Sequence, residues 1–137
     1  MKNVNIYLKN QNKGPRRQSR KGIYILERIT NAGPATYTGF IKTEDCSQNK
    51  ADILILIKAL EHLKMPVALA IYTSNPYVAA VLGKDNKHQE LWKNQKGEPL
   101  SNTEEWQKVD KLLKEHTYEV HTGKHSYLDW MMEQIKE

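Results

Sequence analysis

The chain has 137 residues, of which 39% are hydrophobic and 27% charged, a size and composition typical of one compact domain. No apolar stretch approaches the roughly 20 residues of a membrane-spanning helix, and the start of the sequence lacks the apolar segment of a signal peptide. The single cysteine, Cys46, excludes an internal disulfide, and no Cys/His cluster has zinc spacing. We therefore expect one soluble cytoplasmic domain over residues 1–137, without membrane association.

The net charge of +5 is unevenly distributed along the chain. The first 28 residues carry eight Lys or Arg and a single acid, Glu27, so they hold +7 and leave −2 for the rest. A basic segment on a near-neutral body favours a surface that meets a polyanion, because phosphate contacts supply the sequence-independent part of nucleic-acid affinity. The alternative is a solvated basic hairpin with no partner.

The first half of the chain predicts three strands, a helix and a fourth strand. Residues 4–9 alternate apolar and polar side chains, and residues 21–30 and 35–44 form two more strands around a turn at 31–34. Ser47 is a plausible N-cap for a helix over residues 47–64, which carries a helical apolar stripe. Residues 65–73 are almost entirely apolar, as in a strand buried on both faces of a parallel sheet.

The second half predicts helices around one further strand. Asn75 and Pro76 suit the N-cap and first position of a helix over residues 76–83, and Asn102 suits the N-cap of a helix over residues 103–116. A strand at 117–122 and a helix at 126–137 follow, and we expect Trp106 and Trp130 to pack in the core. This order of elements indicates an α/β fold with a mixed sheet, an antiparallel meander followed by parallel strands.

Four short motifs lie in order on these predicted elements. In the most specific one, Gly-x-Pro-x-x-Asn-x-x-x-Trp-x-x-x-Asp-x-Leu, the matching positions are Gly97, Pro99, Asn102, Trp106, Asp110 and Leu112. The other three lie at residues 6–10, 49–61 and 73–78. Through them the chain resembles the type 1 ribonuclease H family over nearly its whole length. The resemblance implies a ribonuclease H-like fold, a five-stranded mixed sheet flanked by helices.

The family cuts the RNA strand of an RNA·DNA hybrid with two Mg²⁺ ions held by four carboxylates. Carried over position by position, these carboxylates fall on Lys9, Asp52, Ser74 and Asp129, and the family's loop histidine on Lys124 or His125. A site of formal charge −4 thus becomes −1. A shift of one residue in the first strand would place Asn10 instead of Lys9 and would restore no acid.

The resemblance therefore implies a degraded catalytic set, whose remnant catalytic positions are Asp52, Asp129 and His125. We expect no metal or other cofactor, with Asp52 and Asp129 as the ligands of Mg²⁺ or Mn²⁺ if the domain is active. We also expect the Lys9 ammonium to occupy the place of the metal pair and to be bonded by Asp52 and Asp129.

Two basic segments are candidates for contact with nucleic acid. The first follows the opening strand and, with one polar residue of the first helix, gives the candidates Lys13, Arg16, Arg17, Arg20, Lys21 and Asn49. The second resembles the basic, Trp-containing segment with which some family members grip the DNA strand, and comprises Lys84, Lys87, Trp92, Lys93 and Lys96.

Three functions are compatible with these residues. The first is a catalytically impaired relative that still binds nucleic acid, either RNA·DNA hybrid or duplex. The second is an active Mg²⁺- or Mn²⁺-dependent hybrid ribonuclease with an atypical site. The third is a protein-interaction domain that keeps the scaffold and has lost nucleic acid.

Overall fold

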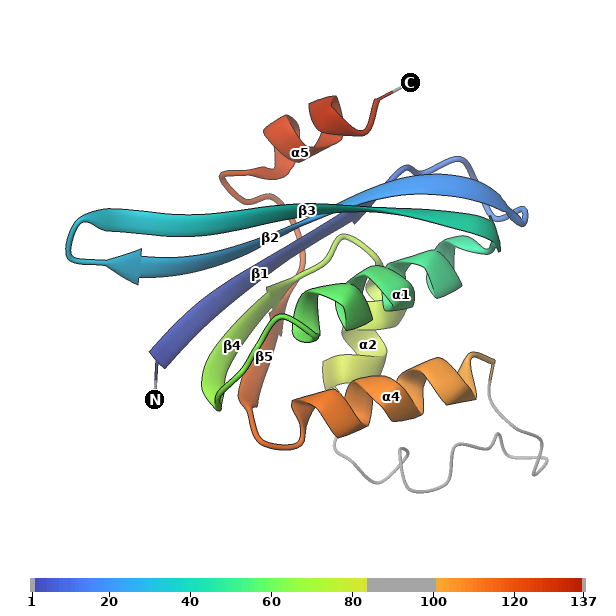
Figure 1. Ribbon diagram of the computed structural model, residues 1–137. Helices are drawn as coiled ribbons and strands as arrows, with labels where there is room; N and C mark the ends of the chain where they lie inside the picture. Colours follow the sequence, from blue (N-terminus) through green and yellow to red (C-terminus); the bar gives the residue numbers. More distant parts are fainter. Residues whose placement is uncertain (1, 84–100, 137) are drawn as a thin grey trace.

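A computed structural model of the chain describes residues 2–83 and 101–136. Within them a five-stranded sheet has α1, α2 and α4 on one face and α5 on the other (Figure 1). The elements are β1 (Lys2–Asn10), β2 (Gln18–Thr30), β3 (Gly33–Cys46), α1 (Gln48–Leu60), β4 (Val67–Tyr72), α2 (Pro76–Gly83), α4 (Thr103–Leu113), β5 (Thr117–His121) and α5 (Leu128–Gln134).

The strand order is β3-β2-β1-β4-β5, which places β1 at the centre of the sheet. The pairs β1–β2 and β2–β3 are antiparallel, whereas β1–β4 and β4–β5 are parallel. The predicted mixed sheet, a meander followed by parallel strands, is therefore confirmed. None of the described helices is both long and apolar enough to cross a membrane.

Successive side chains of β1 point to opposite faces of the sheet and pack in two different hydrophobic cores. Ile6 and Leu8 pack on the face that α1 covers, while Tyr7 packs on the opposite face, under α5. There Met131 of α5 and Ile135, the residue that follows this helix, are buried with Ile23 and Ile25 of β2. The end of β1 consequently lies between helices on both sides of the sheet.

Three helix termini test the predicted caps. Ser47 caps α1, because its Oγ accepts a hydrogen bond from the Lys50 N–H at 3.2 Å. Asn75 caps α2 in the same way, with its Oδ1 accepting from the Tyr77 N–H at 2.9 Å. The prediction of a side-chain cap at Asn102 is wrong, because this residue has a left-handed backbone (φ 64°) and makes no side-chain cap bond to α4.

The tryptophans divide between core and surface. Trp106 is buried with 2% of its surface exposed, as predicted, and its indole N–H donates to the Tyr77 hydroxyl at 3.0 Å. The prediction for Trp130 is wrong, since this side chain is 48% exposed. On the short helix α5 the neighbouring Met131 takes the inward-facing position instead.

Candidate active site

Three of the four carboxylate positions meet at one small cavity. Lys9 at the end of β1, Asp52 on α1 and Ser74 after β4 all line a cavity of about 200 Å³. The remaining lining residues are polar or small: Asn10, Asn12, Gln48, Asn49, Asn75 and Pro76. The carboxyl ends of the parallel strands β1 and β4 and the first turns of α1 bring them together.

The fourth position lies in a different cavity. Asp129 is exposed on α5 and lines a larger cavity of about 640 Å³ between the end of β1 and that helix. Lys9, Asn10 and Asn12 line both cavities, so the end of β1 and the following residues separate the two remaining acids.

Three side-chain amides hold the Asp52 carboxylate. Asn10 Nδ2 donates to Oδ1 at 2.8 Å, and Oδ2 accepts from Asn75 Nδ2 at 2.7 Å and from Gln48 Nε2 at 3.3 Å. The residue as a whole is only 9% exposed. Since a carboxylate can only accept, these donors satisfy its charge inside the protein.

The amide of Gln48 connects Asp52 to a buried arginine. Arg20 Nη1 donates to Gln48 Oε1, and the other donors of the guanidinium bind the backbone carbonyls of Gln11, Gly14, Arg16 and Cys46. Arg20 is completely buried. Its expected contact with nucleic-acid phosphate is therefore wrong, because its donors fix the loop after β1 and the entry to α1.

The Lys9 ammonium bonds to neither acid. Its Nζ donates to Ser74 Oγ at 3.0 Å, and it forms no ion pair with Asp52 or Asp129. The expectation that both aspartates bond Lys9 is therefore wrong. Asp52 instead accepts hydrogen bonds from the three amides.

The Asn10 side chain, which binds Asp52, packs closely against the neighbouring strand β2. Its side chain is 2% exposed and lies over Gly22 of β2, where an added Cβ would stand 2.2 Å from Asn10 Oδ1. That oxygen is the buried side-chain polar atom without a hydrogen-bond partner among the described residues. Glycine at position 22 thus makes room for the amide that binds Asp52.

His125 lies in an aromatic cluster on the α5 face of the sheet. Its ring centroid is 4.6 Å from that of Tyr7 and 5.6 Å from that of Tyr72, and its Nδ1 accepts from the Tyr127 N–H. Burial lowers the pKa of His125 below its ordinary value, which favours the neutral ring. His125 lines neither cavity described above, and Lys124 is exposed.

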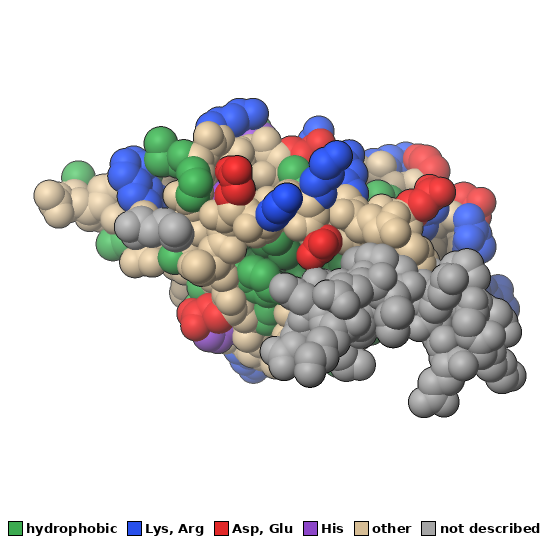
Figure 2. All heavy atoms as spheres, turned by 90° about the horizontal axis from the view of Figure 1, so that it is seen from below, with side chains coloured by type: hydrophobic (Ala, Val, Ile, Leu, Met, Phe, Trp, Pro, Cys, Tyr) green, Lys and Arg blue, Asp and Glu red, His purple; other side chains and the backbone are tan. Residues whose placement is uncertain are grey.

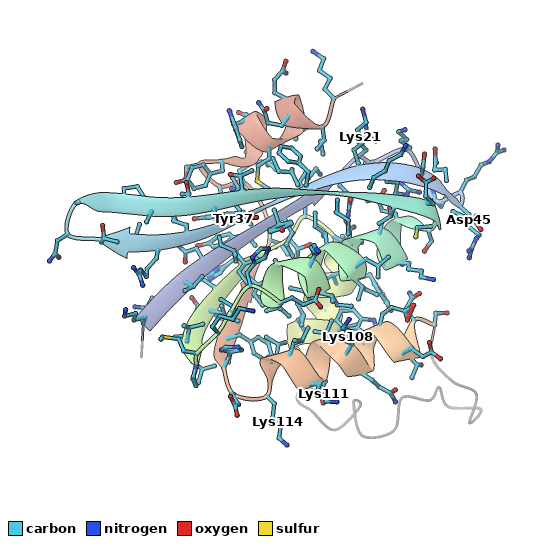
Figure 3. The ribbon with its side chains drawn as sticks, viewed as in Figure 1. Lys21, Tyr37, Asp45, Lys108, Lys111 and Lys114 are labelled. Atoms are coloured by element: carbon cyan, nitrogen blue, oxygen red, sulfur yellow. The ribbon has the colours of Figure 1, made fainter. Side chains whose placement is uncertain are left out.

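The candidate nucleic-acid contacts lie in different settings. Arg17 is exposed and pairs with Asp45, its Nε and Nη2 donating to the two carboxylate oxygens at 3.1 and 3.2 Å. This bond lowers the pKa of Asp45. Lys21 points away from the sheet on the side of α5, as Figure 3 shows.

The remaining candidate contacts lie near the two cavities or outside the described residues. Arg16 is exposed and Lys13 lines the larger cavity, whereas Asn49 lines the smaller one and accepts from Asn75 Nδ2 at 3.0 Å. On the face seen in Figure 2, basic and acidic side chains are intermingled. Lys84, Lys87, Trp92, Lys93 and Lys96 lie outside the described residues.

The amides around Asp52 were not anticipated from the sequence. The spacing of four residues between Gln48 and Asp52 is a usable signal, because it places both on one side of a helix. The contributions of Asn10 and Asn75 depend on the packing of β1 and of the α2 entry against α1, which no local pattern reveals.

These residues do not fit a pair of divalent metal ions. Mg²⁺ requires several oxygen ligands in near-octahedral geometry. Here the oxygens of Asp52 bind N–H donors, Lys9 brings a positive charge, and Ser74 contributes only a hydroxyl. Within residues 2–83 and 101–136 no group of three or more His, Cys, Asp or Glu side chains could hold a metal ion.

Comparison with known proteins identifies the scaffold. A sequence profile of the family described as RNase H matches residues 2–125. A ribonuclease H of Clostridium botulinum is 32% identical over 76 residues, which cover 53% of this chain and 51% of that protein. The chain thus spans about half the length of this relative.

Solved structures show the same fold. LC9-RNase H1, described as a type 1 RNase H with the type 2 active-site motif, superposes with a TM-score of 0.79 at 14% identity, covering 98% of this chain and 70% of that one. LC11-RNase H1 in complex with RNA/DNA hybrid gives a TM-score of 0.62 at 16% identity, covering 95% and 91%. With the profile matching most of its residues, the chain belongs to the ribonuclease H family.

Proposed function

We propose that this ribonuclease H domain binds nucleic acid, either RNA·DNA hybrid or duplex, without cutting it. The observation that carries the proposal is the environment of Asp52. Both of its carboxylate oxygens bind side-chain amides, while the two neighbouring carboxylate positions hold Lys9 and Ser74.

Electrostatics oppose a metal pair in this cavity. Two unit charges about 4 Å apart interact by roughly 4 kcal/mol at an effective dielectric near 20, and a divalent ion doubles that figure. The Lys9 ammonium would therefore repel an ion where an aspartate would attract it. Binding at Asp52 would also break hydrogen bonds to a charged group, each worth about 1.5–3 kcal/mol.

Binding of a polyanion is compatible with the same structure. The exposed Arg16 and Lys21 and the cavity-lining Lys9 and Lys13 follow one another along the end of β1, the next loop and the start of β2. Phosphate contacts by such side chains require no metal. The LC11-RNase H1 structure, which shares the fold, holds an RNA/DNA hybrid, and this supports hybrid as the first ligand to test.

The decisive experiment follows binding and cleavage of one substrate. An RNA·DNA hybrid labelled at the RNA 5′ end is incubated with the protein in Mg²⁺ or Mn²⁺ and resolved on native and denaturing gels. We expect salt-dependent retardation and intact RNA. Reversing the charge at Arg16 and Arg17 to Glu should weaken retardation, because phosphate contacts set the slope of affinity against salt.

Matched controls distinguish the possible outcomes. The same reversal at Lys111 on α4 and at Lys114 just after this helix, both labelled in Figure 3, should leave retardation nearly unchanged. RNA cleavage that Asp52→Asn abolishes would establish an active nuclease and overturn the proposal. A lack of hybrid and duplex binding at roughly 50 mM salt, where phosphate contacts are strong, would instead indicate a protein-interaction domain.

A further inference from the structure

We propose that the Lys9 ammonium binds a backbone phosphate of the nucleic acid in place of metal ions, so that binding at this site is independent of divalent cations. The inference deepens the function proposed above and rests on it. The ligand is a phosphodiester, and Lys9 is the cationic side chain that lines both cavities.

The hydrogen bonds of Lys9 leave it able to take a phosphate. A lysine ammonium has three donors, and here one of them is directed to a neutral acceptor, Ser74 Oγ, at 3.0 Å. No carboxylate of the described residues forms an ion pair with Lys9. The acids Asp52 and Asp129 line the same cavities but form no direct ion pair with Lys9.

The neighbouring acid is satisfied without Lys9. Asp52 receives amide donors from Asn10, Asn75 and Gln48, and Gln48 in turn accepts from the buried guanidinium of Arg20. This network joins one buried acid to one buried base. Lys9 is not part of this network, and it lines both cavities.

The position of Lys9 suits a strand that passes the end of β1. Lys9 lines both the cavity of about 200 Å³ and the cavity of about 640 Å³, the larger of which has a volume ordinary for ligand sites. Lys13 and Lys136 also line the larger cavity, together with Asp129 and Glu133. Three bases against two acids leave an excess positive charge, although Lys136 pairs with Glu133 at 3.8 Å.

Ser74 has a defined part in this arrangement. Its hydroxyl anchors the ammonium at 3.0 Å without adding negative charge. Aspartates at positions 9 and 74 would repel a phosphate unless metal ions lay between them. The Lys9–Ser74 pair therefore replaces both the ions and the ligands that hold them.

The test measures hybrid affinity by fluorescence anisotropy in EDTA and in Mg²⁺ at matched ionic strength. We expect equal affinity in both for the unmodified protein. Lys9→Gln should weaken binding roughly tenfold near 50 mM salt and reduce the slope of log affinity against log salt by about 0.9, the value for one lost phosphate contact. Lys9→Arg should keep the slope, because it keeps the charge.

Lys111→Gln serves as the charge-matched control, since Lys111 is exposed on α4 and lines neither cavity. Its effect on affinity should be small. If the unmodified protein binds hybrid but Lys9→Gln has the same affinity and slope, the assignment of Lys9 is overturned while the proposed function stands. Loss of binding in EDTA would overturn it as well. No binding by the unmodified protein in either buffer would refute the proposed function itself.

Discussion

Gly22 on β2 and Asn10 on β1 lie so close that a methyl group on the glycine would stand 2.2 Å from Asn10 Oδ1. The two residues are partners in the antiparallel register of these strands. The contact fixes Asn10 with its Nδ2 toward Asp52. The absence of a Cβ at Gly22 thus allows Asn10 to donate its hydrogen bond to Asp52 on α1.

Gly22→Ala should therefore disturb the candidate site as well as the sheet. The new methyl group would also lie 2.8 Å from Ile55 Cδ1, so the side chains of Asn10 and Ile55 would both have to move. We expect a loss of about 1–3 kcal/mol in the free energy of unfolding, measured by urea denaturation. Gly83→Ala is the control, because among the described residues its added Cβ meets nothing within 4 Å beyond its chain neighbours and its own helix. Equal stability of Gly22→Ala and the unmodified protein would show that Asn10 is free to move.

Arg20→Lys should destabilise the protein although the charge is kept. Lysine has three donors and cannot serve the five acceptors that Arg20 binds, so buried carbonyls would lose their partners. We expect a loss of about 3 kcal/mol in the free energy of unfolding and faster amide hydrogen exchange in residues 11–17. Arg16→Lys, at an exposed side chain, should change stability by less than about 0.5 kcal/mol. Similar values for the two variants would contradict the structural role of Arg20.

The sequence predicted the mixed sheet and the order of elements along the chain because alternation, helix caps and turn residues are local signals. Ser47 and Asn75 act as caps in the way their residue types suggest. The helix ends were less predictable: α1 ends at Leu60 and α4 at Leu113, a few residues before the predicted ends at 64 and 116. The end of a helix depends on what packs beyond it as well as on periodicity.

The candidate site was predicted only in part, because its main interactions join distant segments. Lys9, Asp52 and Ser74, which the family motifs single out, line one cavity. Composition could not distinguish Arg20, which is fully buried, from Arg16 and Arg17, which are exposed. Burial of a charge depends on whether tertiary structure supplies its acceptors, and the Arg20 acceptors come from the loop, β3 and α1.

Asp52→Asn should lower stability whether or not the domain has activity. The new amide would place an N–H donor against the amides of Asn10, Asn75 or Gln48, which need an acceptor there. We expect a loss of about 1–3 kcal/mol in the free energy of unfolding at neutral pH. Asp110→Asn, at an exposed position of α4, should change it by less than about 0.5 kcal/mol. A gain in stability from Asp52→Asn would instead indicate a strained acid of the kind that awaits a metal ion.

Glu27 links α5 to the sheet through hydrogen bonds that depend on its charge. Its carboxylate accepts from Asn5 Nδ2 and the Tyr7 hydroxyl, both at 2.9 Å, and from the Tyr127 hydroxyl just before α5. Burial raises the pKa of Glu27, whereas the three hydrogen bonds lower it. The hydrogen bonds together have the larger effect, so the pKa lies below the ordinary 4.5. Burial and the hydrogen bond to Glu27 raise the pKa of Tyr7.

The sign of the pH dependence follows from that shift. A carboxyl whose pKa is lower in the folded than in the unfolded state stabilises the fold above the unfolded value, and this stability is lost as the pH falls through the folded value. Tyr127→Phe should cost about 1–2 kcal/mol at pH 7, and the cost should shrink below about pH 4.5 as Glu27 takes up a proton. Urea denaturation from pH 7 down to pH 3 measures this difference. Glu115→Gln, at an exposed residue, should change stability by less than about 0.5 kcal/mol at pH 7. A Tyr127→Phe cost that is the same at every pH would mean that the charge of Glu27 does not strengthen its bond to Tyr127.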